Sequence, residues 1–405
     1  MRNLTSMPAT NSLAQAPTQR LLSLDVLRGA TIALMILVNT PGSWSHVYAP
    51  FLHAKWHGLT LTDLVFPSFV FIVGVSLYFS LGRYGWAGAS ISEGAPRPLA
   101  RAFVKVARRT GLIFLVGLLL NAFPFYDVVL GELRIYGVLQ RIALSYGLAA
   151  TLCLLIPPRR WLLTAGGVAV LYWAVLALGG GAAPYALETN VVRHFDLATL
   201  GADHLYGGFG VPFDPEGFLG LLGTAINMLL GAYAGYLIKR NPDVLSADSG
   251  TTALERSVKP LLLFGLVLVV IGLALGEVLP VNKPLWTSSY ALLTSGITAC
   301  ALGVCIEWVD VRGHRRGLSP FVHFGANPLV IYALSSVLAK AAYAVFTWTG
   351  PDDQPVSLYD WLYSDVFARL IPVPKLASLA FALMVVALCW SVAYWMYRRR
   401  IYVKL

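Results

Sequence analysis

Long apolar blocks alternate with short polar connections along this chain. The blocks have the length that a helix needs to cross a bilayer, and they lack the short alternating runs of a membrane β-barrel. Because a backbone in lipid must satisfy its own hydrogen bonds, such blocks predict membrane-spanning helices. We expect an all-α polytopic helical bundle with about ten transmembrane helices, at roughly 22–40, 63–82, 104–122, 135–156, 161–178, 218–238, 260–277, 288–308, 319–347 and 375–397.

The polar segments indicate the domain boundaries. Residues 1–20 are polar and low in complexity, which predicts a disordered cytoplasmic tail. No other polar segment is long enough to fold alone, so residues 21–405 are expected to form a single transmembrane domain. The first apolar run follows the tail and is longer than the core of a signal peptide, which predicts a retained helix.

Composition and charge support this topology. Hydrophobic residues make up 57% of the 405 residues and charged residues only 12%, about half the charged share of a soluble domain. With ten spans, nearly all lysines and arginines fall on one side, which is predicted to be cytoplasmic together with both termini. The formal charge of +10 is spread over several short loops, so no nucleic-acid partner is expected. The other side holds only Lys55, Arg134, Arg193, Lys283, Arg369 and Lys375.

Several familiar site patterns are absent from the sequence. It contains no Walker loop, no G-x-G-x-x-G fingerprint and no H-E-x-x-H motif. The halves show no repeat of the kind many transporters carry, which weakens a transporter interpretation. The cysteines lie inside predicted spans without metal-type spacing, so we expect buried thiols, no disulfide framework and no metal site. They are Cys153, Cys300, Cys305 and Cys389.

The connection between the first two predicted spans carries the candidate chemistry. Asp63 opens the second span, where a carboxylate suits the helix dipole and can cap the helix. A carboxylate beside an imidazole such as His53 can also fix its tautomer and support general-base chemistry. His53 and His57, four residues apart, are compatible with a metal pair, although Gly58 disfavours a helix there. Spacing alone favours capping and leaves the other two interpretations open.

Charged residues inside predicted spans are the next candidates, because burial in lipid is costly. Asp25 and Arg28 are three residues apart and can pair on one helix face. Arg141 lies far from either end of its span, and a guanidinium is well suited to bind phosphate. Lys340 and Glu307 also lie within spans. The structural alternatives for all of them are snorkelling and buried ion pairs.

Six motifs in a fixed order, and the tail, resemble the heparan-α-glucosaminide N-acetyltransferase family of transmembrane acyltransferases. The resemblance runs from about residue 20 to the C-terminus and is closest to a bacterial-type member. The matching stretches are Leu24–Gly29, His53–Pro67, Gly137–Arg141, Asp203–Tyr206, Asp214–Gly217, Pro280–Tyr290 and the tail Tyr397–Leu405.

The resemblance implies an integral membrane acetyltransferase. Such an enzyme moves an acetyl group from cytoplasmic acetyl-CoA to the amine of a glucosamine-type sugar on the outer side of the membrane. By motif match, His53 is implied as the active-site histidine, with Asp63 and Asn39 as its polar partners. A base removes the proton of an attacking amine, and an amide such as that of Asn39 can donate to the forming oxyanion.

Binding residues follow from the same motifs and from charge. The phosphates of acetyl-CoA need cationic partners, and we expect them among Arg141, Arg28, Gln140 and Lys283. The lipid bilayer and the amino sugar are the expected partners, in a bacterial inner (plasma) membrane. An amino-sugar permease is the alternative function, and a homodimer is left open. The expected acceptor-binding residues are Trp56, His204, Asp203, Glu216, Asn282 and Trp286.

Overall fold

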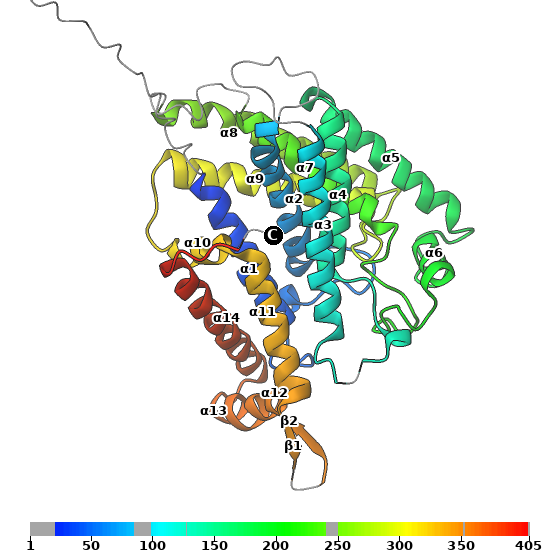
Figure 1. The fold of residues 1–405 in the computed structure, drawn as a ribbon, viewed down its shortest axis with the longest axis vertical. Helices are drawn as coiled ribbons and strands as arrows, with labels where there is room; N and C mark the ends of the chain where they lie inside the picture. The colour runs from blue at the N-terminus through cyan, green and yellow to red at the C-terminus, as the bar shows by residue number, and fades with distance from the viewer. Residues whose placement is uncertain (1–20, 85–98, 127, 240–249, 351–352, 404–405) are drawn as a thin grey trace, which may run out of the picture.

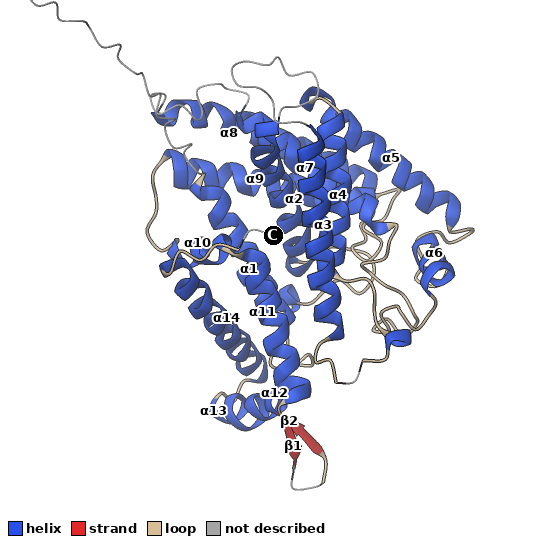
Figure 2. Cartoon of the chain, in the orientation of Figure 1, coloured by secondary structure: helices blue, strands red, loops and turns tan. Residues whose placement is uncertain are grey.

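The computed structural model describes residues 21–84, 99–126, 128–239, 250–350 and 353–403. Within these ranges the chain is helical apart from its loops and one short hairpin, so the predicted all-α bundle is confirmed (Figure 2). The predicted disordered tail at 1–20 lies outside the described residues. The main elements are α1 (Leu22–Asn39), α2 (Leu61–Leu81), α3 (Leu99–Ala122), α4 (Val138–Leu155), α5 (Trp161–Gly179), α6 (Val191–Leu200), α7 (Gly220–Lys239), α8 (Gly250–Gly276), α9 (Ser288–Cys305), α10 (Ser319–Ala326), α11 (Pro328–Lys340), α12 (Leu358–Trp361), α13 (Ala368–Leu370), α14 (Pro374–Arg398), β1 (Thr347–Thr349) and β2 (Pro355–Ser357).

Nine helices of the described chain are long and apolar enough to cross a membrane, against about ten expected. The difference is α3, which corresponds to the predicted span at 104–122. This helix has 24 residues, enough to cross, but its first half carries Arg101, Lys105, Arg108 and Arg109. It packs against α4 with one face, and its other face, which includes Val104 and Leu115, is exposed.

The predicted span at 319–347 is broken into two helices. α10 ends at Ala326 and α11 starts at Pro328, because a proline cannot continue the hydrogen bonding of the preceding turn. A π-helical turn, Ala341–Val345, extends α11. Lys340 has no ion pair among the described residues: its Nζ donates to the carbonyl of Leu120 at 2.6 Å and so caps the end of α3.

The bundle has a central pair of helices with others around it (Figure 1). α2 and α7 pack along each other, α3 and α4 lie beside them, and α8 packs on α9. α1, α10, α11 and α14 form a neighbouring group, and the β1–β2 hairpin projects from one end next to α12. The apolar side chains of α2 are almost all buried, so this helix is the structural centre.

Glycines bring α2 and α7 into close contact. A Cβ atom at Gly74 would overlap the carbonyl of Met228, and one at Gly231 would overlap the carbonyl of Phe71. Small residues at such crossings let helix backbones approach closely in membranes. The tight crossing fixes α2, whose first turn contains Asp63.

The outer helices present apolar side chains to the surroundings. Leu163 and Leu171 of α5 and Leu263 and Val270 of α8 are more than half exposed. Exposed apolar surface of this extent is unusual for a soluble monomer and is what a lipid-facing helix requires. The chain is therefore an integral, multi-pass membrane protein.

Gly74→Ala is expected to lower the melting temperature in detergent. Alanine normally stabilises a helix relative to glycine by up to about 1 kcal/mol, but here its methyl group overlaps α7. Gly166→Ala in α5 is the matched control, because a Cβ there meets nothing within 4 Å; its melting temperature should stay equal or rise. If both variants become more stable, the close α2–α7 crossing is wrong.

Candidate active site

Asp63 connects the histidine-containing loop to the start of α2. Its Oδ2 accepts hydrogen bonds from the backbone N–H of Ala54 at 3.0 Å and of Thr60 at 3.1 Å, and from the Thr60 hydroxyl at 2.9 Å. Its Oδ1 lies 2.7 Å from Nδ1 of His53. The carboxylate therefore caps the helix, as the spacing favoured, and also holds the imidazole, while the general-base role stays a prediction.

The Asp63 contact determines what His53 can do. Because a carboxylate accepts, it favours the tautomer with the proton on Nδ1 and leaves the lone pair on Nε2. The His53 side chain is 47% exposed, whereas that of Asp63 is 1% exposed. An oriented, accessible imidazole supported by a buried carboxylate is the arrangement that general-base chemistry needs.

Lys283 lies at the same pair. Its Nζ is 3.0 Å from Nδ1 of His53 and 3.4 Å from Oδ1 of Asp63. Burial lowers the pKa of the Lys283 ammonium, and the charge of Asp63 opposes that shift. The Tyr290 hydroxyl donates to the backbone carbonyl of Asp63 at 2.6 Å. The first turn of α9 and the segment before it therefore support the site, and Lys283, expected among the acetyl-CoA residues, lies at the imidazole.

An open groove of about 640 Å³ adjoins this site. Asn282, the chain neighbour of Lys283, supports the groove wall: its Nδ2 donates to the carbonyl of Trp56 at 2.9 Å and lies 3.2 Å from Nδ1 of His57. Burial lowers the pKa of His57. The principal side chains along the groove are those of Lys55, Trp56, His57, Tyr185, Glu188 and Phe209.

A second cavity, of about 530 Å³, lies along α2, toward the C-terminal end of the helix from Asp63. It is lined by α2 residues from Phe69 to Ser80. At 1.5 Å per residue, Phe69 lies about 9 Å along the helix from Asp63. The cavity therefore extends away from the neighbourhood of the His53–Asp63 pair toward the other end of the helix.

Cations gather in this second cavity, which we call the basic cavity. Arg28 donates to the Ser76 hydroxyl at 2.7 Å and pairs with Asp25 at 3.2 Å, so the predicted Asp25–Arg28 pair is confirmed. Arg109 lies 4.6 Å from the ring centre of Tyr146, and its buried Nε has no partner among the described residues. The cations that line the cavity are Arg28, Lys105, Arg108 and Arg109.

Arg141 and Gln140 are buried elsewhere. Arg141 donates from Nη2 to the carbonyl of Gly217 at 3.0 Å and lies over the ring of Trp286 at 5.2 Å. Nε and Nη1 of Arg141 and Nε2 of Gln140 have no partner within the described part of the chain. Of the four residues expected at the phosphates of acetyl-CoA, only Arg28 lines the basic cavity.

Only two of the six expected acceptor-binding residues lie at the groove. They are Trp56 and Asn282. Glu216 pairs with Arg134 at 2.7 Å, and Arg134 also binds Asp214 through two nitrogens at 2.7 and 2.8 Å. Two further expected residues have contacts away from the groove: Trp286 donates to Asn227 at 2.8 Å, and His204 contacts the Leu133 carbonyl at 2.7 Å. Asp203 is exposed, and its side chain makes no hydrogen bond within the described ranges.

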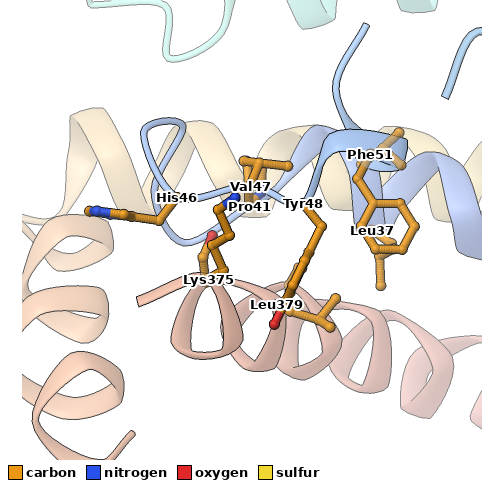
Figure 3. A pocket seen from close by; sticks show the side chains of 11 residues that line it. Leu37, Pro41, His46, Val47, Tyr48, Phe51, Lys375 and Leu379 are labelled. Carbon is orange, nitrogen blue, oxygen red and sulfur yellow. The ribbon is translucent and has the colours of Figure 1, made fainter. Parts of the chain in front are cut away.

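Asn39 and His46 precede His53 in the chain. Asn39 is exposed at the end of α1, and its side chain makes no hydrogen bond within the residues that the structure describes. His46 points away from Tyr48 and Phe51 (Figure 3) and lies 3.3 Å from the Tyr363 hydroxyl. The pocket beside it holds about 20 Å³, room for one water molecule and not for a sugar.

Sequence reasoning did not select the cations that α3 contributes to the basic cavity. Lys105, Arg108 and Arg109 are spaced by three and four residues, which places them on one helical face. The spacing is visible in the sequence, but the same three charges also fit the cytoplasmic side of the predicted topology, so they do not by themselves indicate a binding cavity. Tyr185 and Phe209 gave no such signal, because aromatic residues are common in connections near a membrane surface.

The chain is similar in sequence to known proteins over most of its length. The family model "Heparan-alpha-glucosaminide N-acetyltransferase, catalytic" matches residues 20–267. The human heparan-alpha-glucosaminide N-acetyltransferase is 31% identical over 409 residues, covering 86% of this chain and 57% of the human protein. The mouse protein of the same name is 27% identical over 390 residues, covering 84% and 56%. The chain thus spans about half the length of the curated relatives it matches.

Asp196 gives a pH-dependent prediction. Its Oδ1 accepts from the N–H of Phe218 at 3.1 Å, but its buried Oδ2 has no partner among the described residues. Burial raises the pKa of Asp196 to about 7. Between about pH 4 and 7 the folded state keeps a proton that the unfolded state has lost, so this group makes stability fall as pH rises.

Asp196→Asn should therefore melt at a higher temperature than the wild type at pH 8 and at a similar temperature at pH 4. Thermal unfolding in detergent across this range measures the difference. Asp203→Asn, an exposed neighbour, should show no pH-dependent difference. Equal destabilisation of Asp196→Asn at every pH would mean that the ionised carboxylate has a partner it needs.

Proposed function

The chain belongs to the heparan-α-glucosaminide N-acetyltransferase family, and we propose that it transfers an acetyl group from acetyl-CoA to the amine of a glucosamine-type sugar. The observation that carries this proposal is the place of His53. Its oriented imidazole lies beside the open groove. Its partner Asp63 lies in the first turn of α2, and the later turns of α2 line the basic cavity. Two substrates arriving from opposite sides would meet there.

The basic cavity suits the phosphates of acetyl-CoA. It is within the usual size range of ligand pockets, and its four cations match a polyanionic ligand. Arg109 offers a buried nitrogen that no described residue satisfies. With the phosphates at α3, the acetyl end would extend along α2 past Phe69 toward Asp63. The excess of basic residues at the α3 end supports entry of acetyl-CoA from the cytoplasmic side.

The proposed transfer uses His53 as the base. The amine nitrogen of the sugar bonds to the thioester carbonyl carbon, and Nε2 of His53 takes the amine proton. The carbon–sulfur bond then breaks, and CoA leaves as a thiolate that recovers a proton from the imidazolium. Asp63 stabilises that imidazolium, and the amide of Asn39, exposed at the end of α1, is the proposed donor to the oxyanion.

The acceptor would approach through the groove, past Trp56 and Asn282. We place this end of the bundle, with the hairpin, on the outer side of a bacterial plasma membrane, because it carries few lysines and arginines.

His53→Ala should reduce acetyl transfer to glucosamine by at least about 10²-fold, the usual effect of losing a general base. Acetyl-CoA binding should persist, because the cations of its cavity lie elsewhere. Asp63→Asn should lose less activity. His46→Ala is the control and should retain normal turnover. Free CoA release in the presence of acceptor gives the rate. Normal turnover of His53→Ala would exclude His53 as the base, whereas a wild type that releases no CoA when acceptor is added would favour a permease.

Arg109→Ala should weaken acetyl-CoA binding by about 10–100-fold, since a charge-assisted hydrogen bond contributes about 1.5–3 kcal/mol. Arg159→Ala removes a cation from the loop before α5 that does not line the cavity, and it should leave the affinity unchanged. Titration calorimetry in detergent measures both. Equal affinities for Arg109→Ala and wild type would move the phosphates out of the basic cavity.

A further inference from the structure

The groove beside His53 is close enough to receive whatever is attached to the acceptor sugar. Lys55, on its wall, is two residues from His53, so their Cα atoms are at most about 7 Å apart. Asn282 holds that wall through the Trp56 carbonyl, and its neighbour Lys283 touches His53. A sugar with its amine at the imidazole therefore has the groove next to its remaining linkage.

Aromatic rings form much of the groove surface. Trp56 and Phe209 meet edge to face with ring centres 5.9 Å apart, and the Trp56 indole N–H donates to the Tyr185 carbonyl at 2.8 Å. The rings are thus held in place. Aromatic faces bind apolar faces of a ligand, and they attract cationic groups such as ammonium.

The charges of the groove do not suit a polyanion. Lys55 and Glu188 offset each other, and burial lowers the pKa of His57, so this imidazole is uncharged at neutral pH. The described cations nearby are engaged: Lys283 by Asp63, and Arg193 by the carbonyls of Pro212 and Glu188.

The whole end of the bundle that carries His53 also holds more acidic than basic residues. Leaving aside the partly protonated Asp196, its described connections and helix ends hold ten acidic residues against seven basic ones, which creates a negative field. The acidic residues are Asp63, Glu132, Glu188, Asp203, Asp214, Glu216, Glu277, Asp353, Asp360 and Asp365, and the basic ones are Lys55, Arg134, Arg193, Lys283, Lys340, Arg369 and Lys375.

We infer that the groove binds the sugar units attached to the acceptor glucosamine, and that it selects glucosamine oligomers free of sulfate and carboxylate groups. This inference rests on the proposed transfer to a glucosamine amine. The ammonium groups of such an oligomer match Glu188, the aromatic rings and the negative field, whereas sulfates would be repelled. The groove would thus set specificity while His53 supplies the chemistry.

The experiment compares acceptors at fixed acetyl-CoA with the purified full-length protein. The probes are glucosamine, its unsubstituted dimer and tetramer, and a disaccharide with a terminal glucosamine next to a sulfated uronic acid. The wild type should show kcat/KM at least about tenfold higher for the dimer than for the monomer, equivalent to about 1.4 kcal/mol. The sulfated disaccharide should fall below the dimer.

Glu188→Lys tests the charge argument on an exposed side chain of the groove. It should reduce the preference for the dimer over the sulfated disaccharide. Phe209→Ala should remove the advantage of the dimer. Trp348→Ala, an exposed aromatic on the hairpin, is the control and should alter neither ratio.

The outcomes separate this inference from the proposed function. If the wild type acetylates monomer and oligomers with equal kcat/KM, the groove is not an acceptor subsite, although the transferase activity stands. A preference for the sulfated disaccharide, or no effect of Glu188→Lys, overturns the charge-based selection. If no amino sugar is acetylated, the proposed function itself fails.

Discussion

The buried carboxylate of Asp63 is the constraint on which the rest of the site depends. A buried charge is costly unless it is paired and hydrogen-bonded. Here the donors come from three places: His53 and Ala54 in the loop, Thr60 at the helix cap, and Lys283 before α9. Satisfying one carboxylate therefore fixes the loop, the start of α2 and the neighbouring connection relative to one another.

The position of α2 in the bundle is fixed as well. Its close crossing with α7 at Gly74 and Gly231 leaves little freedom to shift along the axis. The same helix contributes Asp63 near one end, and Ser76 and Ser80 to the basic cavity near the other. A single rigid helix thus relates the imidazole to the cations, which is what transfer between substrates on opposite sides would require.

The features that depend on neighbouring residues in the chain could be predicted from the sequence. Apolar block length predicted the spans, and the place of Asp63 at a helix start predicted its cap. The pairing of His53 with Asp63 was expected from the family resemblance, and the structure shows their contact. Contacts that depend on packing were not predictable: the phosphate role expected of Arg141 stays a prediction, and its contacts with Gly217 and Trp286 bring together residues far apart in the chain. The cations of α3 had the right spacing, but only the packing of α3 beside α1, α2 and α4 shows that they line one cavity.

Transfer across the membrane between two separately entered cavities is the central claim, and proteoliposomes test it directly. Acetyl-CoA with a labelled acetyl group is sealed inside the vesicles, and glucosamine is supplied only outside. Labelled N-acetylglucosamine should then appear in the external medium, and none should form when both substrates are outside sealed vesicles. Product formed with both substrates on the same side, and none when they are separated, would contradict the account.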